Sequence, residues 1–278
     1  MNTQRVTTVP LFAIAFGALL SSPLTLAAAT WYLNAGQPSG ADWDAIPFWS
    51  AAPDGSGGNP SLISEADTFD SNGKILRTPA QESYFGGASL VLSGSRLLMI
   101  QDADINGTLT TSAAGSVVTL ASIKSRTLKV GTLKPVGNGI CFWVDKAEAT
   151  LTINVNKLTG DAPVTFGAPE KPGTVIFTAD DASAFTGNLH VTGNATNVIF
   201  GNALDIAGTL VLDAGSSITL DQKLSFNAVN IAGADLPAGT YSFAQLNATH
   251  DTFFNEGGAG SIIVKGQRAP TPPAPSSP

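Results

Sequence analysis

The chain has 278 residues, of which 43% are hydrophobic and only 13% are charged, about half the charged share of an ordinary soluble domain. Its 21 acidic and 14 basic residues give a net charge of −7, which argues against a nucleic-acid binder, because such proteins carry clustered Lys and Arg. The single cysteine, Cys141, excludes an internal disulfide, so core burial and backbone pairing have to stabilise the fold.

Residues 1–29 have the pattern of a secretory signal peptide. Arg5 precedes an apolar stretch over residues 9–20, and residues 27–29 are the three alanines of a small-residue cleavage site. The apolar stretch is shorter than the ~20 residues that a membrane-spanning helix needs. We expect cleavage after Ala29, a secreted protein, and no transmembrane segment after signal cleavage.

Residues 30–87 are rich in tryptophan and in turn-forming residues. Trp31, Trp43 and Trp49 lie among stretches of Gly, Pro, Ser and Asn, which leave little room for regular elements. Residues 70–73 are a predicted turn between short strands at 67–69 and 74–77. We expect an irregular N-terminal cap, because a stacked β array needs a cover for its open apolar end.

From residue 88 to residue 266, short apolar runs alternate with Gly, Asn, Asp and Ser. Leu151, Ile153 and Val155 fall at every second position, which places them on one face of a strand. The best helix candidates are only the short segments 180–185 and 244–247. The region is therefore predicted to be all-β, and the proline-rich residues 267–278 are predicted to form a disordered tail.

Several apolar positions in this region recur 21 residues apart. They are Leu189, Leu210 and Ile231; Val191 and Leu212; and Ile199, Leu220, Tyr241 and Ile262. A period near 20 residues, with two or three short strands per repeat, predicts a parallel β-helix, or solenoid. Gly-Thr-Leu and Gly-Thr-Val triplets begin at the irregularly spaced residues 107, 131, 173 and 208, so the repeat is degenerate. An antiparallel β-sandwich is the alternative.

Three stretches carry a family resemblance. Residues 31–49 are similar to an opening W-x-x-N…W…W pattern, residues 67–92 to an entry segment with D-x-F, R-T-P and F-G-G-x-S-L-x-L, and residues 236–264 to a terminal coil. On these residues the chain resembles secreted parallel β-helix proteins with autotransporter-associated β-strand repeats, of the type found in Verrucomicrobia, Planctomycetes and related Gram-negative bacteria. The resemblance implies a place outside the cell or on its outer surface, and we expect no membrane barrel.

Residues 102–107 read D-A-D-I-N-G, the opening of a calcium loop. Oxygen ligands from Asp102, Asp104 and Asn106, with glycine at the sixth position, would wrap a hard cation. The twelfth position is Ala113, where a bidentate Glu is required. A polar turn between strands is the favoured interpretation, and calcium is the only candidate cofactor.

One short region concentrates basic residues, namely Lys124, Arg126, Lys129 and Lys134. Lys124 and Arg126 are two apart and would share a strand face, about one coil after the aspartates at 102 and 104. A basic residue beside calcium would suit a β-helix polysaccharide lyase, but no lyase motif accompanies it. We interpret this region as a solvated outward face.

Other reactive residues are few. The chain has only His190, His250 and Cys141 to offer as nitrogen or sulfur ligands, which argues against a zinc site. His190 should point outward from a strand, and Cys141 should be a small buried residue. Asp180 and Asp181 are interpreted as a helix N-cap or a turn, because paired glycosidase carboxylates face each other ~5–9 Å apart across a sugar. No catalytic residue is assigned.

Four aromatic residues are the candidate ligand-binding residues: Trp31, Tyr32, Trp43 and Trp49. Aromatic rings can stack on sugars, although plugging the open end of the helix is the favoured alternative. The sequence thus predicts a secreted, right-handed, single-stranded parallel β-helix of structural or adhesion type that contacts cell-surface or extracellular polysaccharide. Two alternatives stay open, a β-helix polysaccharide lyase or glycoside hydrolase and a carbohydrate-binding module.

Overall fold

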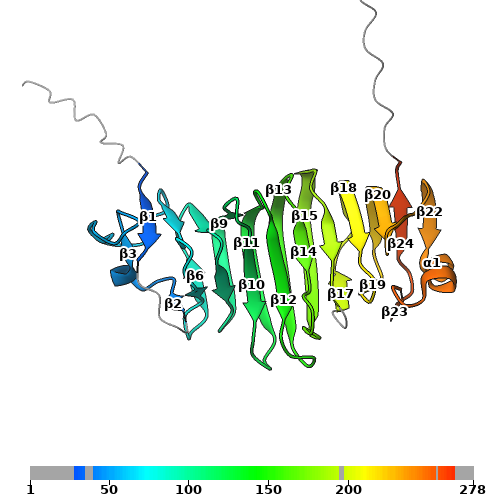
Figure 1. Cartoon of the computed structure of the whole chain (residues 1–278), viewed down its shortest axis with the longest axis horizontal. Helices are drawn as coiled ribbons and strands as arrows, with labels where there is room; N and C mark the ends of the chain where they lie inside the picture. The colour runs from blue at the N-terminus through cyan, green and yellow to red at the C-terminus, as the bar shows by residue number, and fades with distance from the viewer. Residues whose placement is uncertain (1–27, 35–39, 194–196, 255, 267–278) are drawn as a thin grey trace, which may run out of the picture.

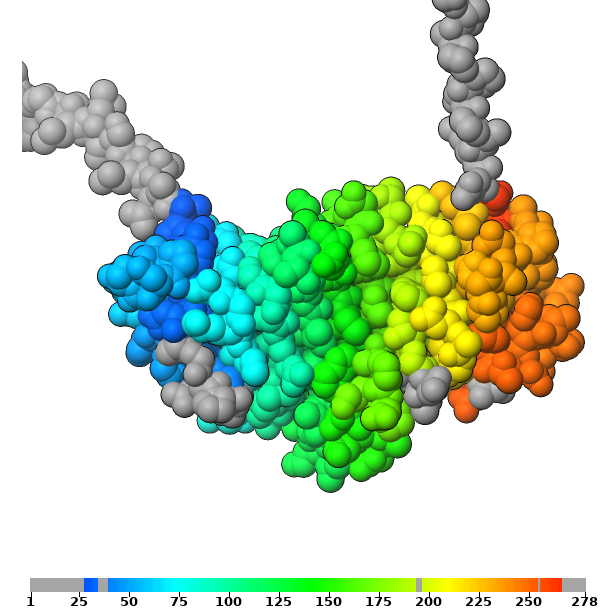
Figure 2. All heavy atoms as spheres, viewed as in Figure 1, coloured from blue at the N-terminus to red at the C-terminus, as the bar shows by residue number. Residues whose placement is uncertain are grey.

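The computed structural model describes residues 28–34, 40–193, 197–254 and 256–266. The predicted proline-rich tail and all of the predicted signal peptide except its last two residues lie outside the described residues. The chain folds as a parallel β-solenoid of about six turns. Figure 1 shows the coils stacked along one long axis, and Figure 2 shows them as adjoining bands of colour. The parallel β-helix prediction is confirmed and the sandwich alternative is wrong, while the handedness stays a prediction.

Two long sheets run along the stack. The first sheet contains β1 (Thr30–Leu33), β3 (Trp49–Ser50), β4 (Thr68–Asp70), β6 (Ser83–Phe85), β7 (Ser89–Leu92), β9 (Ala103–Thr111), β11 (Arg126–Lys134), β13 (Thr150–Gly160), β15 (Thr174–Phe185), β17 (Asn197–Phe200), β19 (Ser217–Leu220) and β23 (Glu256–Gly257). The second contains β2 (Ala41–Asp42), β5 (Leu76–Arg77), β8 (Arg96–Leu98), β10 (Ser116–Leu120), β12 (Ile140–Val144), β14 (Val164–Phe166), β16 (Leu189–Val191), β18 (Leu204–Leu212), β20 (Lys223–Ile231), β21 (Ala234–Asp235), β22 (Gly239–Ser242) and β24 (Ser261–Val264).

The longest strands bend, so that one strand contributes to two sides of a coil. The first part of β9 pairs with β6 and its last part pairs with β7, although β6 and β7 are separate strands. The register between β9 and β11 shifts between Val130 and Thr132, where the bend lies. Each such coil therefore has three straight segments, namely the two parts of the bent strand and a strand of the second sheet such as β10. This agrees with the two or three short strands per repeat that the sequence analysis expected.

Coil length varies along the stack. Leu128 pairs with Ala103 on one side and with Ile153 on the other, 25 residues away in each direction. Leu210 pairs with Leu189 at the predicted distance of 21 residues, but its next partner is Val229 and not the predicted Ile231. The 21-residue spacing is therefore confirmed for one step and wrong for the next.

The other 21-residue series also fail in places. Ile199 pairs with Thr219 rather than with Leu220. Tyr241 does lie opposite Ile262, but in the antiparallel β22–β24 pair, so these two positions are not successive parallel coils.

Two of the Gly-Thr triplets mark the bends. A Cβ atom at Gly131 would overlap the carbonyl oxygen of Asn106, and one at Gly208 would overlap that of Gly187. Glycine is needed where one backbone crosses this close to the next. Gly173 instead precedes a strand at a different corner, and this explains why the triplets are spaced irregularly.

Alternation along the strands fills the interior with apolar side chains. Leu151, Ile153 and Val155 are buried as predicted. Phe166 is fully buried, and its ring centroid lies 5.1–6.2 Å from those of Phe142, Phe177 and Phe200. Such aromatic pairs stabilise a core beyond their area burial.

The segment 30–87 is tied into the same stack. The strands β1 and β4 continue the first sheet in parallel register, and β2 and β5 continue the second. Asp67 explains the D-x-F pattern, because its carboxylate accepts hydrogen bonds from the backbone N–H of Ala29 and from the indole N–H of Trp31, both at 2.9 Å. The strand pairing thus reaches into the segment that the sequence assigned to an irregular cap.

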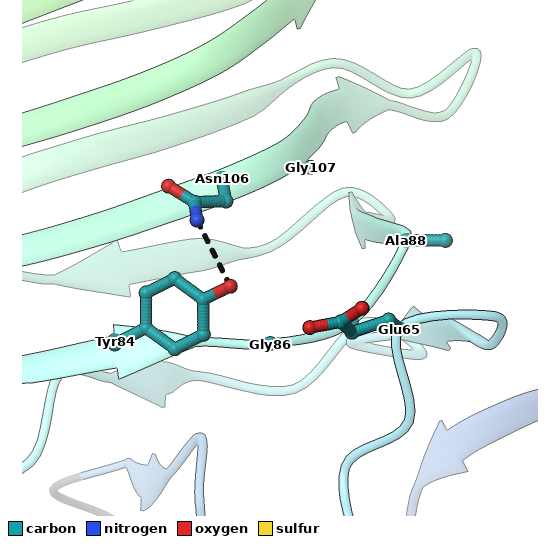
Figure 3. A pocket seen from close by; sticks show the side chains of 7 residues that line it. Glu65, Tyr84, Gly86, Ala88, Asn106 and Gly107 are labelled. Atoms are coloured by element: carbon teal, nitrogen blue, oxygen red, sulfur yellow. Dashed lines mark hydrogen bonds between the residues drawn. The ribbon is translucent and has the colours of Figure 1, made fainter.

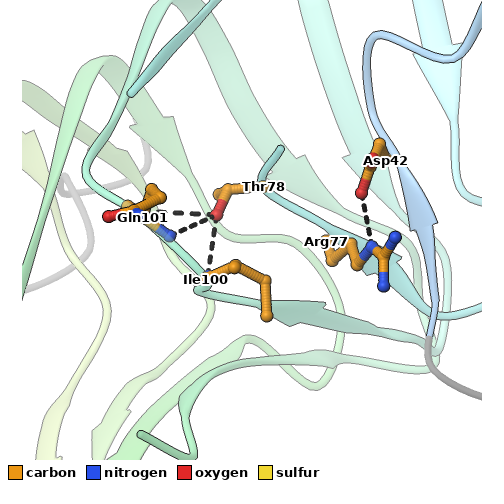
Figure 4. A network of polar contacts seen from close by, with 5 residues as sticks. All are labelled: Asp42, Arg77, Thr78, Ile100 and Gln101. Carbon is orange, nitrogen blue, oxygen red and sulfur yellow. Dashed lines mark hydrogen bonds and ion pairs between the residues drawn. The ribbon is translucent and has the colours of Figure 1, made fainter. Parts of the chain in front are cut away.

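A second polar network closes the corner next to β5. The buried hydroxyl of Thr78 accepts hydrogen bonds from the backbone N–H groups of Ile100 (2.8 Å) and Gln101 (3.1 Å), while Arg77 pairs with Asp42 (Figure 4). These contacts join successive coils, and they serve the fold.

The C-terminal end carries the one α-helix of the described residues, α1 (Phe243–His250). Ser242 caps it, and Ser242 and Gln245 form a capping box. The predicted helix at 244–247 is confirmed. The predicted helix at 180–185 is wrong, because these residues complete β15, where Ala182 and Phe185 are buried against the core. In the described part of the chain, no helix has the length and apolar character to cross a bilayer.

Candidate functional site

The most varied cluster of outward side chains surrounds Tyr84 on β6. Tyr84 is 51% exposed, and its hydroxyl accepts a 2.9 Å hydrogen bond from the side-chain amide of Asn106 on β9 (Figure 3). Its neighbours Ser83 and Phe85 are largely or fully covered, so alternation turns the Tyr84 ring outward. The ring is therefore an accessible platform fixed by one amide.

Two depressions of about 260 Å³ each lie on this side of the solenoid, one lined by Tyr84 itself and the other by its neighbours Ser83 and Asp104. One is lined by Glu65, Tyr84, Asn106 and small residues at 86–88 and 107. The other is lined by Glu82, Asp102, Asp104 and Lys129 with small or hydroxyl neighbours. We call these seven side chains the Tyr84 surface: Glu65, Glu82, Tyr84, Asp102, Asp104, Asn106 and Lys129.

Strand register assembles the Tyr84 surface from distant parts of the sequence. Tyr84 lies opposite Asp104, and Asp104 lies opposite Lys129 on the next strand. Asp102 accepts a 2.8 Å hydrogen bond from the backbone N–H of Thr127, which closes the corner before β11. With four carboxylates against one ammonium, the surface is negative at neutral pH.

The predicted calcium loop has a different backbone from the one expected. Residues 103–111 form β9, so Asp104 and Asn106 lie along an extended strand and the interpretation as a turn is wrong. An extended strand spreads its side chains, whereas a calcium loop wraps them around the ion. Among the described residues, no three Asp, Glu, His or Cys side chains are placed to hold a metal ion. Asp102 and Asp104 line one depression and Asn106 lines the other, and Tyr84 lies opposite Asp104 and is hydrogen-bonded to Asn106.

The predicted aromatic residues divide into two pairs. Trp43 and Trp49 are fully buried, and their rings pack against Phe85 and Phe69 at 5.6 and 5.1 Å. They present no ring face to a ligand in this structure. Trp31 and Tyr32 are half-buried, and the indole N–H of Trp31 is held by Asp67.

The four basic residues do not form one patch. Lys124 lies in the turn before β11, and Arg126 donates from Nε to the Ile100 carbonyl oxygen at 2.8 Å. Lys129 joins the Tyr84 surface, whereas Lys134 follows the bend of β11 and lies on the next side. Lys129 is the one of these four that lines a depression with Asp102 and Asp104, whereas the sequence analysis had placed Lys124 and Arg126 near them.

Asp180 and Asp181 are exposed in the middle of β15, so the interpretation as a helix N-cap or a turn is wrong. Hydrogen bonds from the Ser183 hydroxyl (2.7 Å) and backbone N–H (3.0 Å) lower the pKa of Asp181. This carboxylate is held by its local neighbour.

The histidines and the cysteine are dispersed. His190 faces outward from β16 as predicted, and its Nε2 lies 3.0 Å from an oxygen of Asp213. His250 ends α1. Cys141 is only partly covered as a whole residue, but desolvation raises the pKa of its thiol to about 12, and the thiol donates to the Gly167 carbonyl oxygen at 3.3 Å.

The sequence analysis missed two residues, Tyr84 and Trp143. Both follow an alternating pattern beside buried neighbours, in S-Y-F and C-F-W-V, and this pattern was the available signal. The side chains that contact them, Asn106 at Tyr84 and Arg96 and Lys171 at Trp143, lie more than 20 residues away in the sequence. They become neighbours only through strand register.

No family model, no curated protein and no solved structure matches the chain. The parallel β-solenoid is therefore assigned from its own strand pairing.

Proposed function

We propose that the protein is a secreted or outer-surface β-solenoid of a Gram-negative bacterium, of structural or adhesion type, that contacts polysaccharide through the Tyr84 surface. The solenoid and the sequence resemblance to proteins with autotransporter-associated repeats support this assignment, and so does the signal-peptide pattern of residues 1–29. The observation that carries it is the exposed Tyr84 ring, which Asn106 fixes in one polar depression and whose neighbours Ser83 and Asp104 line a second.

The chemistry of the Tyr84 surface favours a neutral glycan. An aromatic ring packs against the C–H face of a pyranose, and amide and carboxylate groups bind sugar hydroxyls. Glu65, Glu82, Asp102 and Asp104 would repel a polyanion, since one ammonium, that of Lys129, does not offset four carboxylates. The proposal therefore predicts a preference for uncharged polysaccharides.

The test is retention of the protein on insoluble neutral polysaccharides, with the soluble and bound fractions measured for each variant. Tyr84→Ala should reduce the affinity roughly tenfold, because stacking contacts contribute ~1 kcal/mol or more. Tyr84→Phe, which keeps the ring, should bind more strongly than Tyr84→Ala. Tyr241→Ala, at the other end of the solenoid, is the matched control and should bind like the unchanged protein.

Two outcomes would contradict the proposal. The first is equal retention of Tyr84→Ala and the unchanged protein on every glycan. The second is release of unsaturated or reducing ends from a polysaccharide, lost in Asp104→Ala, because it would establish the lyase or hydrolase alternative.

A further inference from the structure

The second sheet carries another outward-facing aromatic residue, the half-buried Trp143 on β12. Two cations approach its ring. The guanidinium carbon of Arg96 lies 5.4 Å from the ring centroid, and the Lys171 ammonium lies 4.8 Å from it. Cation–π attraction of this kind fixes long basic side chains over a ring.

Arg96 and Lys171 differ in how their charge is balanced. Lys171 Nζ lies 2.5 Å from Asp145 Oδ1, and this contact with Lys171 lowers the pKa of Asp145. Arg96 is exposed, and among the described residues its guanidinium has no carboxylate within ion-pair distance. The arrangement thus holds one guanidinium in place with its hydrogen-bond donors available to an anion.

A depression of about 410 Å³ adjoins these residues. Its lining includes Ser95 next to Arg96, Val117 opposite Arg96, and Cys141, which projects from β12 on the same side as Trp143. The remaining lining residues belong mostly to the stacked corners before β8, β10 and β12, where glycine and other small residues predominate.

Thr119 provides an independent observation, a buried hydroxyl group that lacks a hydrogen-bond partner among the described residues. It lies opposite Trp143 and Leu98 at an outward position of β10, yet it has no exposed surface, so neighbouring side chains cover it. Its hydroxyl has no hydrogen-bond partner in the described part of the chain. A buried hydroxyl without a partner is unfavourable, so the packing beside the indole leaves one polar group unsatisfied.

Arg96, Thr119, Trp143 and Lys171 together are here called the Trp143 surface. We propose that this surface binds the anionic sugars of an acidic polysaccharide through Arg96, Trp143 and Lys171. The pyranose ring packs against the exposed edge of the indole, and a carboxylate or sulfate accepts hydrogen bonds from Arg96. Charge-assisted bonds from a guanidinium to an oxyanion are among the stronger polar contacts. The net charge of −7 does not prevent this, because charges beyond ~8 Å are screened at physiological salt. The site does not depend on the Tyr84 surface.

The experiment measures binding of the full mature chain to three soluble polymers by affinity electrophoresis and titration calorimetry. Oligogalacturonate supplies carboxylates, sulfated dextran supplies sulfates, and plain dextran is neutral. We expect at least one of the two acidic polymers to bind at the Trp143 surface, and the acidic polymer that binds identifies the anion. Dextran is neutral, so any binding of dextran belongs to the Tyr84 surface and should be unchanged in Arg96→Gln.

Three variants locate the site. Arg96→Gln, at an exposed position, should weaken binding of the acidic polymer roughly tenfold and should flatten its dependence on salt concentration. Trp143→Ala should weaken it to a similar extent, and Trp143→Phe should recover part of the loss. Lys157→Gln, which removes the same charge from an exposed position elsewhere, should bind normally.

The proposal is overturned if neither acidic polymer binds or if Arg96→Gln weakens the binding of dextran as much as that of the acidic polymer. It is also overturned if Lys157→Gln weakens binding as much as Arg96→Gln, since net charge alone would then explain the affinity. Because Arg96→Gln leaves the core untouched, its result is decisive even if Trp143→Ala misfolds. If the protein binds acidic polymers but no neutral glycan, the proposal for the Trp143 surface stands and the function proposed for the Tyr84 surface is contradicted.

Discussion

The Tyr84 surface and the Trp143 surface each combine an outward-facing aromatic ring with charged side chains, but the charges have opposite signs. Tyr84 is exposed and Trp143 is half-buried. On the first sheet, Tyr84 is held by an amide and is surrounded by four carboxylates. On the second sheet, Trp143 is approached by a guanidinium and an ammonium. In both places the inward neighbours, such as Phe85 and Phe142, are buried apolar residues.

The difference shows how the solenoid separates stability from recognition. Inward positions have to be apolar in every coil, whereas outward positions contact only solvent and their neighbours on adjacent strands. Their charge can therefore change from one side to another without disturbing the core. One scaffold can in this way present two chemically distinct surfaces.

The largest effect is expected from a change in the core under one of the two surfaces. Phe166 contacts three other buried rings, and Phe166→Ala should destabilise the fold by about 3–5 kcal/mol. Since β14 pairs directly with β12, binding at the Trp143 surface should fail before binding at the Tyr84 surface. Urea unfolding and hydrogen exchange measure the two effects.

The control for this experiment is Leu62→Ala, at a side chain that is 56% exposed, which should change stability by less than ~0.5 kcal/mol. Equal loss of both surfaces in Phe166→Ala would mean that the solenoid unfolds as one unit, and it would remove the basis for treating the surfaces separately.

A smaller effect is expected from changing both rings together. Tyr84→Ala and Trp143→Ala lie on different sheets, so their effects on the free energy of unfolding should add within ~0.5 kcal/mol in the double variant. Each single change should weaken only its own ligand class. A coupling energy well above this value, measured by denaturant titration of all four proteins, would show that the two surfaces communicate.

The sequence predicted the fold better than the coil lengths or the surfaces. Alternation at Leu151, Ile153 and Val155 is a local signal, and it was correct. Coil length depends on how many residues each corner takes, and the coil after Leu210 is two residues shorter than the one before it. A fixed period therefore fails at Ile231, even though the alternation itself holds.

The candidate sites depend on register, which local patterns do not contain. The sequence pattern indicated Asp102, Asp104 and Asn106 as the opening of a calcium loop. In the structure they belong to the Tyr84 surface instead, because β6 places Tyr84 beside β9. Trp43 and Trp49 were candidate ligand-binding residues because they are aromatic, but both side chains are buried in the core. Composition identifies residues capable of binding, and only the strand pairing shows which of them face outward together.

A change at Cys141 should affect the fold less than a change in the core, and this residue can therefore report on the Trp143 surface alone. Cys141→Ser should change the free energy of unfolding by less than ~1 kcal/mol, because the thiol makes one hydrogen bond to Gly167. With its pKa raised to about 12 by burial, the thiol is almost entirely protonated at pH 8, and the thiolate is the reactive form. Alkylation by iodoacetamide, followed by mass spectrometry, should therefore be slow at pH 8 and should accelerate as the pH rises or when urea unfolds the chain.

Because Cys141 lines the depression beside Trp143, an acidic oligosaccharide should slow the reaction further, while a neutral glycan bound at the Tyr84 surface should leave it unchanged. Alkylation at the rate of a free cysteine would show that the depression is open to water down to the thiol, and protection by both ligand classes would place them on the same surface.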